Sequence, residues 1–119
     1  MTAIPSEIER FNRLSATWWD SEGPMRPLHV VNALRLGYVR DQIANHRLIP
    51  NNQARLSNLR ILDVWCGGGL LAEPLAWQGA EVVGVDASPG NIAAARMHAE
   101  ARSIKVDYRL GEMHQVLAR

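Results

Sequence analysis

Two short apolar segments, each carrying an aspartate, constrain the fold of this chain of 119 residues more than any other feature. The first contains Asp63 and runs into three consecutive glycines, and the second ends at Asp86. Parallel strands of an α/β fold end at the same edge of the sheet, and a nucleoside-binding crevice forms where they end. The pattern therefore predicts an α/β fold with such a crevice beside the glycines. Trp65 is the exception, because its large indole stands inside the loop.

Hydrophobic periodicity predicts two helices followed by alternating strands and helices. Residues 1–44 form a leader with one helix opened by the S-x-x-E pattern at 6–9 and a second helix from about 28 to 44. Residues 45–58 are polar and are predicted to be a connector. Residues 59–119 alternate strand-like and helix-like segments, at 60–64, 70–78, 81–85, 89–102 and 104–110. This β-α-β-α-β order indicates crossover connections and a parallel sheet.

Two local patterns add detail to the predicted helices. Ser88 and Pro89 have the residue types of a helix N-cap and first turn, so a helix is expected to begin there. In the second leader helix, Val31, Leu34 and Tyr38 are expected on one side.

Composition and charge exclude several classes of function. Lysine and arginine total 13 and aspartate and glutamate total 12, giving a net charge of +1 without a basic run. Nucleic acid is therefore not an expected partner. Cys66 is the only cysteine, so no internal disulfide can form and a reducing compartment is favoured. No stretch reaches the ~20 apolar residues of a spanning helix, and residues 1–10 lack the apolar core of a signal peptide. A cytoplasmic location is predicted.

The residue types of the glycine loop suit a bound nucleoside. Glycines at 67, 68 and 69 permit positive φ and remove every Cβ, so a ligand can lie on the backbone. The helix expected to follow directs free N–H groups toward a carboxylate or phosphate. Asp86, nineteen positions after Gly67, is suited to accept both ribose hydroxyls. The alternative is a plain glycine-rich turn beside a solvated aspartate.

Asp63 distinguishes between two classes of cofactor. Residues 67–72 satisfy the dinucleotide pattern G-x-G-x-x-G/A, which by itself is a weak signal. A carboxylate at the end of the first strand is poorly placed beside a pyrophosphate. It suits a ligand that carries an ammonium and a sulfonium, such as S-adenosylmethionine. The sequence therefore favours a methyltransferase.

Longer segments carry a specific resemblance to a known family. Leu62–Leu71, with the pattern L-D-V-x-C-G-G-G-L-L, and Val85–Ile92, with V-D-A-S-P-x-N-I, resemble class I S-adenosylmethionine-dependent methyltransferases. The leader is most similar to the O-methyltransferases of ubiquinone biosynthesis, in the Trp-Trp-Asp segment Phe11–Pro24, in Arg26–His29 and in Asn32–Tyr38. The resemblance covers nearly the whole chain and implies a Rossmann-like class I methyltransferase fold, truncated after the third strand, with two amino-terminal helices.

The resemblance also implies the residues that bind the cofactor. Arg35 would contact the methionine end of S-adenosylmethionine, and Asp63 would act near its amino group. Gly67 and Gly69 would line the loop, and Asp86 would hold the ribose. It assigns no catalytic residue within this chain. Cys66, Trp18 and Trp19 are expected to be packing residues. The spacing of the four histidines is not that of metal ligands, so each is expected to be a surface or packing residue; they are His29, His46, His98 and His114.

The family resemblance implies a reaction and partners that this chain would serve only in part. The reaction is methyl transfer to a phenolic hydroxyl of a polyprenylated phenol or quinol, with peripheral contact to the inner membrane. The catalytic groups are expected in a half that this chain lacks, so we expect the chain alone to be inactive. The first strand, Ile61–Val64, would keep an open apolar edge that invites oligomerisation or aggregation.

Trp65 is the main departure from the family pattern, because it stands at the family's first glycine. An indole adds roughly 150–250 Å² of surface. Pointing into the pocket it would exclude the ligand, and pointing behind the loop it would overpack the fold at a cost of about 1–3 kcal/mol. A loss of 3 kcal/mol in binding weakens affinity roughly a hundredfold. The third alternative is that the indole turns to solvent.

Two other classes of function stay open at this point. One is a dinucleotide-binding half-domain of an oxidoreductase, which would bind NAD and ignore S-adenosylhomocysteine. The other is a non-catalytic interaction module that pairs through its exposed sheet edge and ignores both cofactors.

Overall fold

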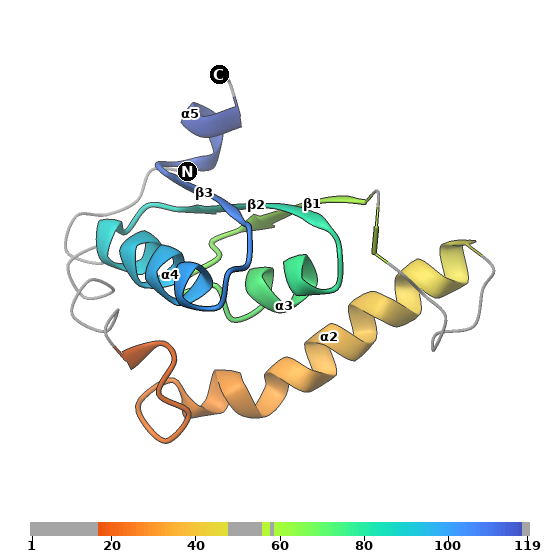
Figure 1. The fold of residues 1–119 in the computed structure, drawn as a ribbon, viewed down its shortest axis with the longest axis horizontal. Coiled ribbons are helices and arrows are strands. Elements are labelled where there is room, and N and C mark those ends of the chain that lie inside the picture. The colour runs from red at the N-terminus through yellow and green to blue at the C-terminus, as the bar shows by residue number, and fades with distance from the viewer. Residues whose placement is uncertain (1–16, 48–55, 58, 118–119) are drawn as a thin grey trace.

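The computed structural model describes residues 17–47, 56–57 and 59–117. The helix predicted to begin at residues 6–9 lies largely outside this range. The order of the remaining elements confirms the predicted alternation of strands and helices (Figure 1). These elements are α2 (Arg26–Arg47), β1 (Arg60–Val64), α3 (Ala72–Trp77), β2 (Glu81–Asp86), α4 (Pro89–Ala101), β3 (Asp107–Leu110) and α5 (Met113–Leu117).

The strands form the predicted parallel sheet, in the order β1-β2-β3. Asp63 on β1 lies opposite Gly84 on β2, which in turn lies opposite Tyr108 on β3. This register brings the carboxyl ends of the strands to one edge, where Asp63 and Asp86 both lie. Within the described residues β1 pairs on one side only, so the predicted open edge of Ile61–Val64 is confirmed.

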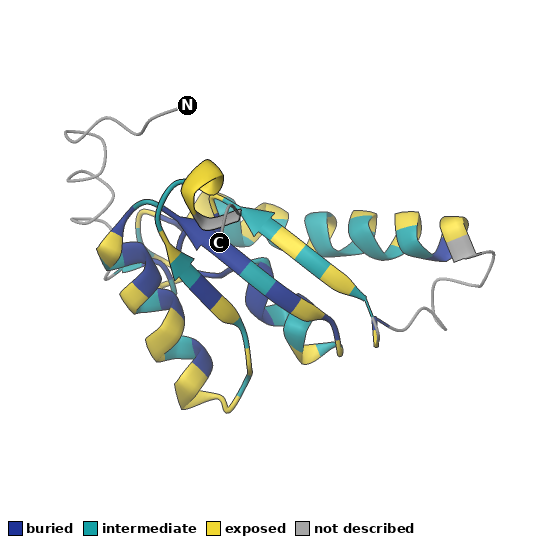
Figure 2. Ribbon diagram, turned by 90° about the horizontal axis from the view of Figure 1, so that it is seen from above, coloured by how far each residue is buried: buried dark blue, intermediate teal, exposed yellow. Residues whose placement is uncertain are grey.

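Three helices cover one face of the sheet. Figure 1 shows α2, α3 and α4 on the same side, with α5 on the other. The main core lies between the sheet and these helices, and its buried members are Leu56, Cys66, Ala72, Leu75, Ala80, Val82, Ile92, Ala95, Ala99 and Tyr108. Figure 2 views the opposite face, where β1 carries exposed and half-buried residues, including Leu62 at 42%. A hollow of about 900 Å³ is lined by residues of all three strands.

The start of α4 confirms the predicted cap. Ser88 has an extended backbone, with φ −93° and ψ 117°, and its hydroxyl accepts the Asn91 amide at 3.2 Å. Pro89 occupies the first helical position, where no amide hydrogen is needed. The sequence rule succeeds here because both residues act through local backbone geometry alone.

Helix α2 is longer than predicted and packs through a different face. It begins at Arg26 rather than near 28, because Pro27 fits a first turn instead of ending the preceding segment. Leu36, Val39 and Ile43 pack against the core. The stripe predicted to share one side is exposed, by 41%, 76% and 66% for Val31, Leu34 and Tyr38.

Two other boundaries differ from the prediction. α3 begins at Ala72 rather than at 70, since the chain is still turning at Gly69, whose amide donates to the Cys66 carbonyl at 3.1 Å. β3 begins at Asp107 rather than at 104, because its pairing with β2 starts there. No helix in the described part of the chain combines the length and apolar character needed to cross a bilayer.

Candidate functional site

The loop between β1 and α3 places every second residue at positive φ. Trp65, Gly67 and Gly69 have φ values of 59°, 57° and 90°. Glycine adopts such values freely, whereas a residue with a Cβ in the left-handed region costs roughly 1–2 kcal/mol. Trp65 therefore occupies a backbone position suited to glycine. Its side chain is 55% exposed, so of the three orientations considered above, the indole takes the one that turns to solvent.

Asp86 braces this loop from the end of β2. One carboxylate oxygen, Oδ2, accepts the Gly67 amide at 2.9 Å. The other, Oδ1, accepts the Ser88 amide at 2.9 Å and the Asn91 side-chain amide at 3.3 Å. Asp86 is only 5% exposed. This carboxylate thus joins the glycine loop to the first turn of α4, a role that its spacing from Gly67 did not reveal.

Asp63 carries a buried oxygen without a hydrogen-bond partner. Its Oδ2 has no donor among the described residues. Burial raises the pKa of the Asp63 carboxyl above its ordinary value of 3.8, the positive charge of Arg35 lowers it, and the negative charge of Asp86 raises it. Three of the residues chosen from the sequence, on α2, β1 and β2, therefore lie within electrostatic range of one another.

Arg35 lies beside a small cavity next to the loop. The cavity has a volume of about 370 Å³ and is lined by Arg35, by Leu71 at the start of α3, and by the α2 residues Val31, Leu34, Tyr38 and Val39. The exposed residues Val31, Leu34 and Tyr38 of α2 thus line the same cavity as Arg35.

The chain's own Trp18 uses the space that the glycines leave free. A Cβ added at Gly67 or at Gly68 would overlap the Trp18 ring, and one added at Gly69 would overlap the Tyr108 hydroxyl. Trp18 is 9% exposed and its indole N–H donates to Asn91 Oδ1 at 2.8 Å. The prediction that Trp18 is a packing residue is confirmed, and the three glycines serve protein packing as well as any ligand.

Two buried groups beneath the loop are kept protonated. Burial, together with the charges of Asp86 and Asp63, raises the pKa of the Cys66 thiol. Burial also raises the pKa of Tyr108, whose hydroxyl oxygen has no hydrogen-bond partner among the described residues. A protonated thiol is a poor nucleophile, in agreement with the prediction that Cys66 is a packed residue. Tyr108 was missed in the sequence, although its central place in an alternating strand marks it as inward-facing.

A buried ionic cluster on α3 and α4 was also missed. Glu73 has a fully buried side chain, and it is paired with His98 at 2.8 Å and with Arg102 at 3.3 Å. His98 therefore has a structural partner, and His29 does too, at 2.8 Å from the Trp18 carbonyl oxygen. Among residues 17–47, 56–57 and 59–117, no three metal-ligating side chains come together. The sequence did offer a signal for this burial, because Glu73 stands in the first turn of α3 between apolar residues.

Comparison with known proteins adds two findings to this geometry. Residues 61–118 match the family described as a methyltransferase domain. The chain is 51% identical over 116 residues to a protein of Azorhizobium caulinodans named ubiquinone biosynthesis O-methyltransferase, and 50% identical over 109 residues to a protein of Sinorhizobium medicae with the same name. The alignments cover 97% and 91% of this chain but 46% and 44% of those relatives, so the chain spans less than half their length.

Solved structures show the same fold. The bifunctional kinase-methyltransferase WbdD is 28% identical, with a TM-score of 0.55, over 71% of this chain and 18% of that protein. Magnesium protoporphyrin IX methyltransferase from Synechocystis PCC 6803, solved with bound S-adenosylmethionine, is 20% identical with a TM-score of 0.63. That match covers 97% of this chain and 58% of the other, and at this identity it bears on the fold alone.

Proposed function

Because this chain belongs to the class I methyltransferases, we propose that it binds S-adenosylmethionine at the glycine loop and the carboxyl ends of β1 and β2. The observation that carries this proposal is the buried, unpartnered Oδ2 of Asp63. An isolated buried acceptor costs free energy unless a donor reaches it. The ammonium of the methionine end supplies such a donor, whereas a dinucleotide pyrophosphate would place a second negative charge there.

The other residues chosen from the sequence fit the same ligand. Arg35, whose charge already acts on Asp63, would face the methionine carboxylate. The backbone of Gly67 and Gly69 would line the ligand site. Trp18 and Tyr108 occupy the space that a Cβ of these two glycines would take. Asp86 would hold the ribose hydroxyls. Its two oxygens accept three internal hydrogen bonds, and a carboxylate offers about four acceptor positions.

Replacing Asp63 by asparagine tests this assignment. We expect Asp63→Asn to weaken binding of S-adenosylhomocysteine roughly tenfold to a hundredfold, because a charge-assisted hydrogen bond to the ammonium is lost. Isothermal titration calorimetry measures the affinity. The same variant should be more stable than the parent at neutral pH. The pKa of Asp63 is raised in the folded state, so its contribution to stability is full below the unfolded value of 3.8 and is lost as the pH rises past the folded value.

Asp107→Asn is the matched control. Asp107 begins β3, at the opposite end of the sheet from the proposed site, and the Arg109 guanidinium holds the pKa of its carboxyl below the ordinary range. Its removal should leave the affinity unchanged and should not stabilise the chain at neutral pH. Equal affinities of the Asp63→Asn variant and the parent protein would contradict the proposed cofactor site.

For the longer proteins of this family, we propose methyl transfer to a phenolic hydroxyl of a polyprenylated ring, in keeping with the name of the relatives. When bound, S-adenosylmethionine supplies an electrophilic methyl group on a sulfonium. In that reaction the methyl group would pass to the phenolic oxygen, the carbon–sulfur electron pair would return to sulfur, and the phenol proton would pass to a base. This chain would contribute binding and orientation of the donor.

We expect the isolated chain of 119 residues to transfer no methyl group to a demethylated quinol. Two of the titratable groups buried beneath the loop, Cys66 and Tyr108, have raised pKa values and stay protonated at neutral pH, so neither of these two can take the phenol proton. Mass spectrometry of the quinol after incubation with S-adenosylmethionine measures the product. Turnover above that of a heat-denatured sample would refute the expectation.

The open edge of β1 supports a second candidate, an interaction module. Unpaired strand edges are templates for pairing with another chain, and Leu62 on this strand is 42% exposed. A stable oligomer that ignores S-adenosylhomocysteine, measured by light scattering, would favour this function over cofactor binding. A cytoplasmic location with peripheral membrane contact remains part of the proposal for the longer proteins.

A further inference from the structure

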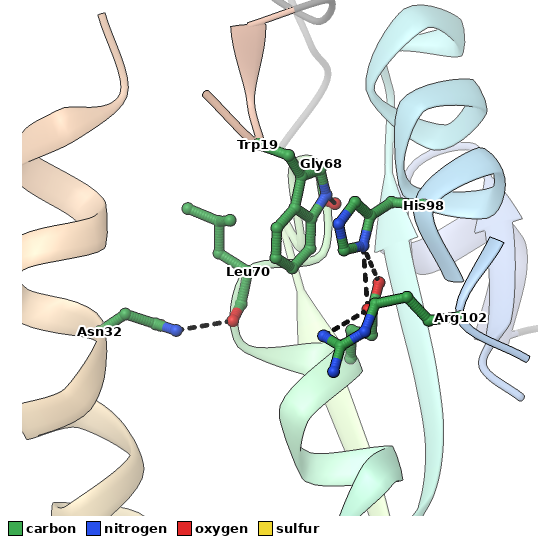
Figure 3. A network of polar contacts seen from close by, with 7 residues as sticks. Trp19, Asn32, Gly68, Leu70, His98 and Arg102 are labelled. Atoms are coloured by element: carbon green, nitrogen blue, oxygen red, sulfur yellow. Dashed lines mark hydrogen bonds and ion pairs between the residues drawn. The ribbon is translucent and has the colours of Figure 1, made fainter. Parts of the chain in front are cut away.

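Two side chains from the amino-terminal segment donate hydrogen bonds to carbonyls of the glycine loop (Figure 3). The Trp19 indole N–H donates to the Gly68 carbonyl oxygen at 2.8 Å. The Asn32 side-chain amide donates to the Leu70 carbonyl oxygen at 2.8 Å. The loop is therefore held from outside as well as by Asp86, and one of the two outer contacts depends on the position of the Trp19 indole.

The indole of Trp19 lies flat on the imidazole of His98. The two ring centroids are 3.6 Å apart and the planes differ by 3°. His29 also contacts Trp19, edge-on, with centroids 6.2 Å apart and an interplanar angle of 73°. A stacked platform fixes the plane of an indole. In that plane the Trp19 N–H points at the Gly68 carbonyl oxygen.

The platform is itself held by a buried charge. His98 Nδ1 donates to both carboxylate oxygens of Glu73, at 2.8 and 2.9 Å, because a carboxylate can only accept. Glu73 is fully buried on α3, and Arg102 contacts the same carboxylate from the end of α4 at 3.3 Å. His98 thus stands between the Glu73 carboxylate and Trp19, whereas Arg102 makes no hydrogen bond to the indole within the described residues.

We infer that His98 is a positioning residue for the proposed cofactor site. Held by Glu73, its ring keeps Trp19 stacked, and Trp19 keeps the Gly68 carbonyl and the loop around it in the shape that receives the ligand. This inference rests on the proposed function for its effect on affinity. Its effect on the loop itself does not depend on any ligand, so the two can be tested separately.

The test compares three variants by amide hydrogen exchange and by titration with S-adenosylhomocysteine. His98→Ala removes the platform. Trp19→Phe keeps a ring on His98 but removes the N–H, and changes no charge, so it serves even if His98→Ala fails to fold. Arg102→Gln is the control, because it also removes a partner of Glu73 without touching Trp19.

We expect His98→Ala and Trp19→Phe to speed exchange of the Gly67 and Gly69 amides and to weaken binding of S-adenosylhomocysteine about fivefold, the value of one hydrogen bond. Arg102→Gln should do neither. Unchanged exchange in Trp19→Phe would overturn the inference, and so would equal loosening by Arg102→Gln.

The inference and the proposed function fail in different ways. If the parent protein does not bind S-adenosylhomocysteine, the proposed function fails, while the exchange comparison still decides whether His98 shapes the loop. If the parent binds and both variants loosen the loop without loss of affinity, the positioning role is overturned and the cofactor site stands.

Discussion

Replacing Asp86 by alanine is expected to lower the free energy of unfolding by about 3 kcal/mol and to abolish binding of S-adenosylhomocysteine. The change removes, at the buried end of β2, the carboxylate that accepts from three donors, namely the Gly67 and Ser88 amides and the Asn91 side chain. Each buried donor left without a partner costs about 1–3 kcal/mol. Since a domain of this size has a total stability of about 5–15 kcal/mol, this is a large fraction. Urea unfolding followed by circular dichroism measures it.

Glu81→Ala serves as the control for Asp86→Ala. Glu81 is an exposed acidic residue at the other end of the same strand, and its side chain is not part of the loop. Its removal should change the free energy of unfolding by less than about 0.5 kcal/mol, as is usual for surface substitutions. A loss of less than about 1 kcal/mol in Asp86→Ala, roughly the net value of one hydrogen bond, would show that water replaces the carboxylate. Retained affinity would show that Asp86 does not organise the site.

Trp65→Gly is expected to tighten binding of S-adenosylhomocysteine roughly tenfold and to stabilise the fold by about 1 kcal/mol. Trp65 has a φ of 59°, which glycine adopts without the strain of a Cβ. Its indole is half exposed. Trp65 directly follows Val64, the last residue of β1, and so lies close in sequence to Asp63, whose Oδ2 has no hydrogen-bond donor among the described residues. Although the indole turns to solvent, its removal takes a bulky group away from the loop beside this strand end, and glycine lets the loop adjust to a ligand. Calorimetric titration and urea unfolding measure the two effects.

Two further variants separate the causes. Trp65→Ala removes the indole but keeps a Cβ at positive φ, so it should recover the affinity without the gain in stability. Trp77→Ala removes an indole that is 70% exposed at the last residue of α3, and it should leave the affinity unchanged. If Trp65→Gly and the parent bind equally well, the solvent-facing indole is harmless to the site.

Much of the fold could be predicted because its signals are local. The N-cap at Ser88, the turn at the glycines and the period of the first two strands each depend on a few neighbouring residues, and all appear where expected. Asp63 and Asp86 could be placed together because parallel strands end at one edge. The choice of Arg35 came from family resemblance, and the structure brings it within range of Asp63.

The remaining features depend on contacts that no local pattern encodes. The direction of the Trp65 side chain follows from its backbone φ, which a residue type does not reveal. The buried side of α2 depends on where the helix meets the sheet, so Leu36 is packed and Leu34 is exposed. Glu73 is an acidic residue at the start of a helix, where solvent exposure is the usual outcome. Its burial becomes possible only with His98 and Arg102, which lie twenty-five and twenty-nine positions away.

The contacts that shape the glycine loop also bear on how the chain acquires its native form. Trp18 reaches Asn91 across 73 positions, Trp19 reaches Gly68 across 49, and Asn32 reaches Leu70 across 38. Contacts between distant positions carry a large loop-closure entropy and are slow to form, whereas turns and helices form early. Interactions made after the folding transition state govern the rate of unfolding more than the rate of folding. We therefore expect the glycine loop to be among the last parts of the chain to assemble and the first to open, with Trp18 and Trp19 governing how long it stays assembled.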